Sequence, residues 1–116
     1  MPKNYSLIYE IISIPTFEKQ IKKLVKKYLS LKSEYISLVE SLEIDAKIGT
    51  PIGNNCYKIR LSIASKGAGK RGGARVITYI HIENKKVYLL SIYDKSEKEN
   101  ISYTELQDLL RWIPEL

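Results

Sequence analysis

Several residue types on which metalloenzymes and secreted proteins depend are scarce in this sequence of 116 residues. It contains one cysteine, Cys56, and one histidine, His81. A single cysteine cannot close an internal disulfide, so nothing requires an oxidising compartment and we expect a cytoplasmic protein. One histidine, one cysteine and scattered carboxylates also provide no cluster of metal ligands, so we expect no metal and no other cofactor.

Long apolar runs are also missing. No stretch approaches the ~20 residues that a membrane-spanning helix needs, so we expect no membrane partner. Glu10 interrupts the weakly apolar N-terminus, and no small-residue cleavage site follows, which argues against a signal peptide. We find no repeat, low-complexity tract or linker, and 44% of the residues are hydrophobic. Residues 1–116 are therefore expected to form one globular domain.

Acidic residues are absent from the whole central segment 46–82. This segment is the source of the whole net charge of +6, because the rest of the chain has almost equal numbers of acidic and basic residues. Positive charge without neighbouring acids is typical of a polyanion site, most often for nucleic acid, although a basic solvated surface is the alternative. The basic residues of the segment are Lys47, Lys58, Arg60, Lys66, Lys70, Arg71 and Arg75.

The first part of the chain predicts a strand followed by an α-hairpin. Residues 5–14 are rich in β-branched and aromatic residues and are expected to form a strand that Pro15 ends. Thr16 can cap the helix that follows, and a second helix is expected from about Ser33. The outer face of the first helix is either a solvated surface or an extension of an RNA-contacting surface. Its lysines are Lys19, Lys22, Lys23, Lys26 and Lys27.

The second part predicts a sheet and a last helix. Residues 48–55 have turn chemistry, and strands are expected over 57–63, 75–82 and 86–93. Ser102 and Glu105 form a capping-box pattern at the start of the last helix. The expected fold is α+β with the order β-α-α-β-β-β-α. Its small, mostly antiparallel sheet would have the α-hairpin packed on one face and the other face partly open.

The strand from residue 57 has a core side and a positive side. Tyr57, Ile59 and Leu61 alternate with Lys58 and Arg60, and successive side chains of a strand point to opposite faces. The two cations are therefore expected on the face opposite the core.

The glycine-rich segment 65–74 imitates a nucleotide-binding motif. Gly67, Gly69 and Gly72 match the spacing G-x-G-x-x-G, but a strand follows where a dinucleotide site needs a helix, and Arg71 stands where a P-loop needs Ser or Thr. Its glycines still allow the backbone to approach a partner closely, and the cations among them can reach phosphates. The alternative is a hairpin tip without function.

Without a second histidine or a nucleophile motif, an enzyme of this composition must work with Lys, Arg and Tyr. One suitable reaction is RNA cleavage by the substrate's own 2′-OH, which needs a proton acceptor, a proton donor and cations around the phosphate. Crowded cations would lower the pKa of a lysine and of a tyrosine among them. The candidates, if they converge on one face, are Lys58, Arg60, Lys70, Arg71, Arg75 and Tyr93.

The chain resembles the RelE/ParE superfamily of toxins from bacterial type II toxin–antitoxin systems. Residues 56–61 resemble the RelE strand that carries two active-site cations, and residues 17–28 are similar to the first helix of the HigB-like branch. Residues 66–79 resemble the glycine-rich hairpin of that branch, and residues 88–95 its last strand. The similarity extends over roughly residues 5–110.

This resemblance implies a ribosome-dependent mRNA endonuclease that cuts codons in the decoding site. Lys58, Arg60 and Arg75 match cationic positions of RelE, whereas Lys70, Arg71, Tyr93 and Lys95 match the HigB-like branch. Lys66 and Lys95 are expected to bind substrate. Because the important tyrosine of RelE lies nearer the last helix, Tyr103 is the alternative to Tyr93.

The resemblance also implies partners. They are the ribosome, mRNA and a cognate antitoxin, with which such toxins can assemble into higher-order complexes. The acid-poor segment would favour an acidic antitoxin segment. The alternatives are a ParE-like inhibitor of DNA gyrase without nuclease activity and an RNA-binding fold that has lost activity.

Overall fold

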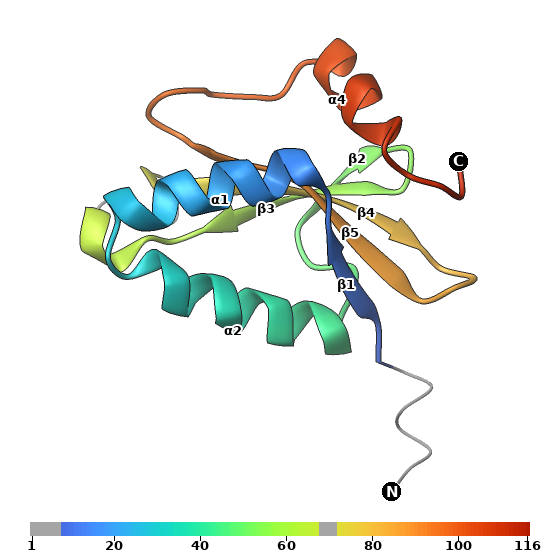
Figure 1. The fold of residues 1–116 in the computed structure, drawn as a ribbon, viewed down its shortest axis with the longest axis horizontal. Coiled ribbons are helices and arrows are strands. Elements are labelled where there is room, and N and C mark those ends of the chain that lie inside the picture. The colour runs from blue at the N-terminus through green and yellow to red at the C-terminus, as the bar shows by residue number, and fades with distance from the viewer. Residues whose placement is uncertain (1–7, 68–71) are drawn as a thin grey trace, which may run out of the picture.

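The computed structural model describes residues 8–67 and 72–116 and has an α+β architecture (Figure 1). Three α-helices and five strands lie within these residues, together with the short 3₁₀ helix η2 (Ala64–Lys66). The helices are α1 (Pro15–Lys27), α2 (Leu31–Ile44) and α4 (Tyr103–Leu110). The strands are β1 (Glu10–Ser13), β2 (Thr50–Gly53), β3 (Cys56–Leu61), β4 (Ala74–His81) and β5 (Lys86–Asp94).

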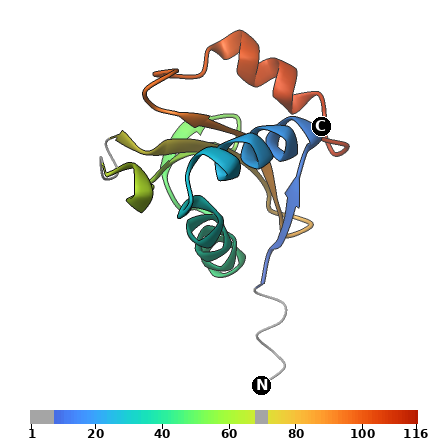
Figure 2. The ribbon, with the colours of Figure 1, turned by 60° about the vertical axis from the view of Figure 1, so that its left-hand side comes forward.

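The five strands form one mixed sheet in the order β1-β5-β4-β3-β2. β1 runs parallel to β5, and the other neighbouring pairs are antiparallel. The hairpin of α1 and α2 packs against the sheet (Figures 1 and 2). α4 also contacts the sheet, at β5, and buries Leu106 and Leu110. The predicted fold class, the α-hairpin on one face and the C-terminal helix are thus confirmed.

Three local expectations were wrong. The segment 48–55 contains a real strand, β2, although Pro51 and Gly53 are poor strand residues, because an edge strand tolerates both. Thr16 does not cap α1. The helix begins at Pro15, whose missing N–H suits the first turn, and Ile14 is the N-cap without a side-chain hydrogen bond. The second helix begins at Leu31, two residues before the predicted start.

The central strands β4 and β5 form the buried centre of the fold. Nearly every residue of both is buried, because helices and loops cover parts of both sheet faces. Their register shifts between Ile77 and Thr78, since Ile77 pairs with Ser91 and Thr78 with Leu89. Leu90 is therefore an extra residue, a bulge that bends β5 a few residues before its end and helps to set the direction of Tyr93.

The predicted capping box at the start of α4 is confirmed. The Ser102 hydroxyl accepts from the Glu105 backbone N–H at 3.1 Å, and the Glu105 carboxylate accepts from the Ser102 backbone N–H at 2.9 Å. Within residues 8–67 and 72–116, no helix is long and apolar enough to span a membrane.

Candidate functional site

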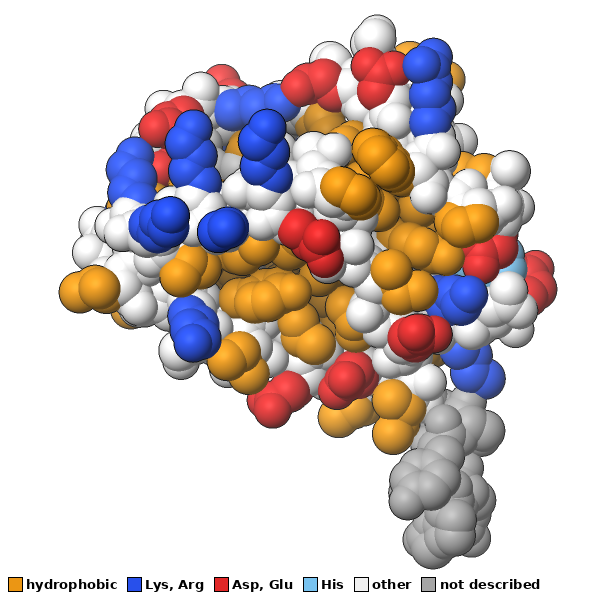
Figure 3. Space-filling view, viewed as in Figure 1, with side chains coloured by type: hydrophobic (Ala, Val, Ile, Leu, Met, Phe, Trp, Pro, Cys, Tyr) orange, Lys and Arg blue, Asp and Glu red, His pale blue; other side chains and the backbone are white. Residues whose placement is uncertain are grey.

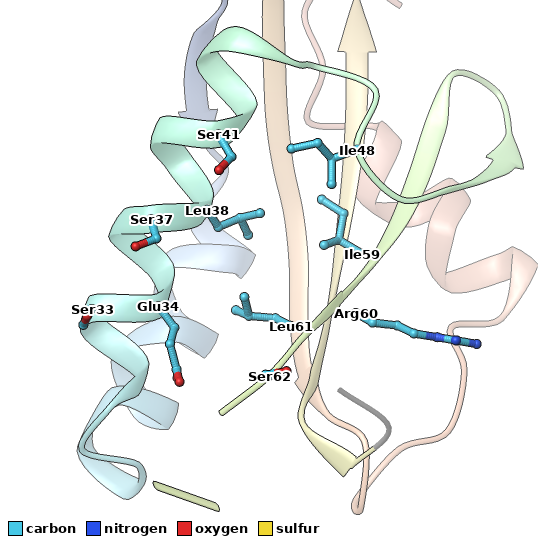
Figure 4. Close-up of a pocket in the computed structure, with 10 residues that line it drawn as sticks. All are labelled: Ser33, Glu34, Ser37, Leu38, Ser41, Ile48, Ile59, Arg60, Leu61 and Ser62. Carbon is cyan, nitrogen blue, oxygen red and sulfur yellow. The ribbon is translucent and has the colours of Figure 1, made fainter. Parts of the chain in front are cut away.

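Three of the predicted site residues form a row across the sheet. Arg60 on β3 lies directly opposite Arg75 on β4, and Arg75 lies directly opposite Tyr93 on β5. Residues paired in this way point to the same sheet face. Figure 4 shows the Arg60 side chain pointing away from α2, opposite to Ile59 and Leu61. Lys58, two residues from Arg60, shares this face, so the predicted convergence of Lys58, Arg60, Arg75 and Tyr93 is supported by the strand register.

Arg75 holds the middle of this row. Its residue surface is 3% exposed, and its Nη1 donates to the Ala74 carbonyl oxygen at 3.1 Å. Arg60, by contrast, is exposed. The row therefore runs from a solvent-facing guanidinium to a buried one, and the neighbouring backbone orients the buried member. A guanidinium held in this way can present two parallel N–H groups to a phosphate.

Tyr93 ends the row in a buried position. The residue is 7% exposed, and its hydroxyl is buried beside the Ile101 backbone. Burial raises the pKa of Tyr93, and the nearby positive charge of Arg75 only partly offsets this effect. The expectation that surrounding cations would lower this pKa was wrong, because the cost of burying a phenolate outweighs their attraction. At neutral pH the Tyr93 hydroxyl thus keeps its proton.

Lys58 borders a small cleft beside the N-terminus of α4. Its Nζ donates to the Asn100 side-chain oxygen at 3.1 Å. The cleft, of about 290 Å³, is also lined by Ile52, Tyr103 and Leu106. Tyr103 is 72% exposed, so the alternative tyrosine lies at the solvent-facing wall of this cleft, outside the row of Arg60, Arg75 and Tyr93.

Lys66 is engaged in an ion pair with Asp94, whose side chain is completely buried. Its ammonium also donates to the Ser96 hydroxyl at 3.2 Å. Asp94 accepts further hydrogen bonds from the Tyr28 hydroxyl at 2.5 Å and from the Ser96 backbone N–H at 2.9 Å. This cluster, the Asp94 cluster, joins α1, η2 and the end of β5 directly beside Tyr93.

The pKa of Asp94 follows from this cluster. Burial opposes ionisation, but the hydrogen bonds from Lys66, Tyr28 and Ser96 outweigh it and hold the pKa of Asp94 well below its ordinary value. Lys66 thus neutralises a buried carboxylate, whereas its predicted contact with substrate stays a prediction.

The remaining predicted residues lie around the glycine-rich segment. The Lys95 Nζ lies 3.7 Å from a carboxylate oxygen of Glu99. The Lys95 backbone N–H donates to the Gly73 carbonyl oxygen at 3.0 Å, which fixes one end of the glycine-rich segment to the end of β5. Gly67 ends η2 with a φ of +80°, a left-handed conformation that favours glycine. Lys70 and Arg71 fall outside the described residues.

Two acidic residues that anchor this region were missed from the sequence. Asp94 is one. The other is Glu34 on α2, which accepts from the Ala64 backbone N–H at 2.6 Å, beside a hydrogen bond between Ser30 and Ser65 at 3.0 Å. Each joins segments about 30 or more residues apart, so no local pattern could reveal the contact. The only available signal for Asp94 was an acid at the end of an apolar strand.

A separate groove between α2 and β3 does not contribute to this row (Figure 4). Its volume is about 380 Å³, and apolar side chains of Leu38, Ile48, Ile59 and Leu61 point into it. Since Arg60 points away from this groove, the cations of the row and the groove lie on opposite sides of β3.

Fold and site together define a class: a small α+β protein with a row of cations and a buried tyrosine across an antiparallel sheet. The sequence model of one family, described as the RelE toxin of the RelE/RelB toxin–antitoxin system, matches residues 15–113. This chain therefore belongs to the RelE toxin family.

Solved structures show the same fold. An arginine-to-alanine double mutant of E. coli toxin RelE in the free state is 20% identical, with a TM-score of 0.53 over 91% of this chain and 98% of that chain. The RelBE2 toxin–antitoxin complex from Mycobacterium tuberculosis contains a chain that is 16% identical, with a TM-score of 0.56 over 75% of this chain and 98% of that chain.

Proposed function

We propose that this protein is a toxin that cleaves mRNA on the ribosome, within the codon that occupies the decoding site. Membership of the RelE toxin family supports the broader role, that of the toxin of a toxin–antitoxin system. The observation that carries the finer proposal is the row of Arg60, Arg75 and Tyr93, which combines cations with a protonated phenol on one sheet face.

The proposed reaction is attack of a ribose 2′-OH on the adjacent phosphate. A bond forms between the 2′ oxygen and phosphorus, and the bond from phosphorus to the 5′ oxygen of the next nucleotide breaks. The products are a 2′,3′-cyclic phosphate and a free 5′-OH. The 2′-OH loses a proton and the 5′ oxygen gains one, so the site must accept one proton and donate another.

Each residue of the row has a separate part in this reaction. Arg60, the exposed member of the row, contacts the scissile phosphate, and the buried positive charge of Arg75 stabilises the charge that develops on the phosphate oxygens. Tyr93, whose hydroxyl keeps its proton at neutral pH, donates that proton to the leaving 5′ oxygen. We assign Lys58 to the 2′-OH side as proton acceptor. Lys66, Lys70, Arg71 and Lys95 are assigned to the flanking phosphates.

The proposed partners are the ribosome with its mRNA and an antitoxin. The RelBE2 structure is a complex of a toxin with its antitoxin, which supports an antitoxin for this chain as well. An acidic antitoxin segment laid over the face of Lys58 and Arg60 would block access of RNA to the row.

Induction of the chain in cells, followed by mapping of new mRNA 5′ ends, tests the proposal. We expect new ends within translated codons, and we expect them to disappear when an antibiotic blocks entry of mRNA into the ribosome. An Arg75→Ala variant should produce few such ends, whereas Lys47→Ala, a cation outside the row, should produce as many as the wild type. Intact mRNA together with trapped gyrase–DNA complexes would instead identify a ParE-like gyrase inhibitor.

A further inference from the structure

A second surface, far from the row of cations, has the properties of a docking site. A groove of about 420 Å³ runs between α1 and α2, and the apolar side chains of Ile21, Val25, Tyr35 and Ile36 line it. The space-filling view shows apolar side chains gathered over this hairpin, with basic side chains along their upper border (Figure 3). Ile36 is 48% exposed, so part of the apolar lining remains in contact with water.

Three lysines also line the groove. They are Lys22 and Lys26 on α1 and Lys32 on α2, and all three are exposed. None of them has an acidic partner within residues 8–67 and 72–116. Glu18, near the start of α1, does not line the groove, and its carboxylate accepts from the Ser13 hydroxyl at 2.8 Å. The groove therefore combines an apolar lining with three lysines and no acidic lining residue.

The structure of the groove favours a helix, and not an extended segment, as its ligand. Both walls are helices, whose interior backbone groups already bond within the helix, so an extended segment would find no sheet edge to pair with. A helix brings its own satisfied backbone and places apolar side chains at i, i+3, i+4 and i+7. The Tyr35 ring, tilted against Phe17 at 5.8 Å, gives such side chains a fixed contact.

We propose that the groove between α1 and α2 binds an acidic amphipathic helix of a partner protein. Its apolar stripe lies on Ile21, Val25, Tyr35 and Ile36, and its carboxylates meet Lys22, Lys26 and Lys32. RNA is a poorer occupant because phosphates would use the lysines but leave the apolar lining exposed. A second copy of the chain would bring its own lysines toward these. The proposal does not depend on RNA cleavage, since it concerns the other side of the fold.

Binding of a defined probe to the purified full chain tests this proposal. The probe is a stapled helix of about 15 residues with leucines at i, i+4 and i+7 and glutamates beside them. Its controls are the same helix with lysine for glutamate and a single-stranded RNA oligonucleotide. We expect the acidic helix to bind and to shift the amide resonances of Val25, Tyr35 and Ile36, and we expect the basic helix not to bind.

Two pairs of variants locate the binding. Ile36→Glu should weaken binding of the acidic helix by about tenfold, which corresponds to ~1.4 kcal/mol of binding free energy. Leu29→Glu, at an apolar residue that is 91% exposed and does not line the groove, should leave it unchanged. Lys22→Glu should weaken it, and Lys19→Glu, on the same helix but outside the groove, should not.

Four outcomes would overturn the proposal. The first three are failure of the acidic helix to bind, equal binding by all variants, and competition by the RNA oligonucleotide for the same resonances. Concentration-dependent self-association that Ile36→Glu removes would identify a second copy as the occupant and would also overturn it. Loss of mRNA cleavage is not among these outcomes, so the two proposals can fail separately.

Discussion

Two regions of the molecule hold positive charge in different ways. On the sheet, Arg75 is almost completely buried and its position is fixed by pairing with both neighbouring strands. On α1, Lys22 and Lys26 are exposed and border an apolar groove. Long lysine side chains on a helix surface keep rotamer freedom, whereas a buried guanidinium has already lost it. The first arrangement suits a reaction that needs fixed distances, and the second suits recognition of a partner.

Substitution of the buried cation should have the largest effect on function. Arg75→Ala is expected to slow cleavage of mRNA on programmed ribosomes by about 10²–10³-fold, the usual loss when one fixed donor to a developing oxyanion is removed. Ribosome binding should fall far less.

Single-turnover cleavage and a ribosome-binding assay measure the two effects. Arg75→Lys is the variant that keeps the charge but not the paired N–H groups. Lys22→Ala, the matched change on α1, should cleave at close to the wild-type rate. If Arg75→Ala and Lys22→Ala lost the same amount of cleavage activity, the two regions would not differ in function as proposed.

The Asp94 cluster should control stability and its dependence on pH. Lys66→Met leaves a buried carboxylate without its main cation and should lower the free energy of unfolding by about 3 kcal/mol at pH 7. Because the pKa of Asp94 is lowered by folding, its ionised form stabilises the protein above the unfolded value of about 4. This contribution is lost as the pH falls below about 4. Urea unfolding between pH 7 and pH 3 measures it.

Asp94→Asn is the control for this pH dependence. It should be less stable than the wild type at pH 7 and should lose less stability on acidification. If Asn at this position left the acid sensitivity unchanged, the buried carboxylate would not be its source.

The cap of α4 should have a smaller and local effect. Ser102→Ala removes one half of the capping box and should cost about 1 kcal/mol. Hydrogen exchange should show faster opening of residues 103–110, while β4 and β5 stay protected. Loss of protection throughout the sheet would mean that α4 and the sheet unfold together.

The smallest effect is expected at Lys47, an exposed cation of the basic segment that lies outside the row. Lys47→Ala should change neither the free energy of unfolding nor the single-turnover rate. A marked loss of cleavage would show that total charge, and not its placement on the sheet, determines activity.

Some of this arrangement could be predicted because it depends on local patterns. The alternation of Lys58 and Arg60 with apolar residues predicted a positive sheet face, and Ser102 with Glu105 predicted the start of α4. The strand β2 was missed because Pro51 and Gly53 have the composition of a turn, and only pairing with β3 reveals a strand.

Other features depend on contacts between distant segments. Tyr28 and Lys66 both reach Asp94 although 66 and 28 residues separate them from it. The raised pKa of Tyr93 also could not be predicted, because burial of its ring is a property of the assembled sheet. The sequence predicted that Arg75 lies near Tyr93, but not that the ring is buried or that the Lys98 ammonium lies 5.4 Å from its centre.

The hydroxyl of Tyr93 provides the most direct test of the proposed site. Tyr93→Phe removes a buried hydroxyl beside the Ile101 backbone but keeps the ring, so the free energy of unfolding should change little. Its single-turnover cleavage rate should nevertheless fall strongly. Tyr28→Phe, which loses the hydrogen bond to Asp94, should lower stability, and Tyr103→Phe should cleave at close to the wild-type rate. A Tyr93→Phe variant that cleaves at the wild-type rate, beside a Tyr103→Phe variant that does not, would contradict the proposed site.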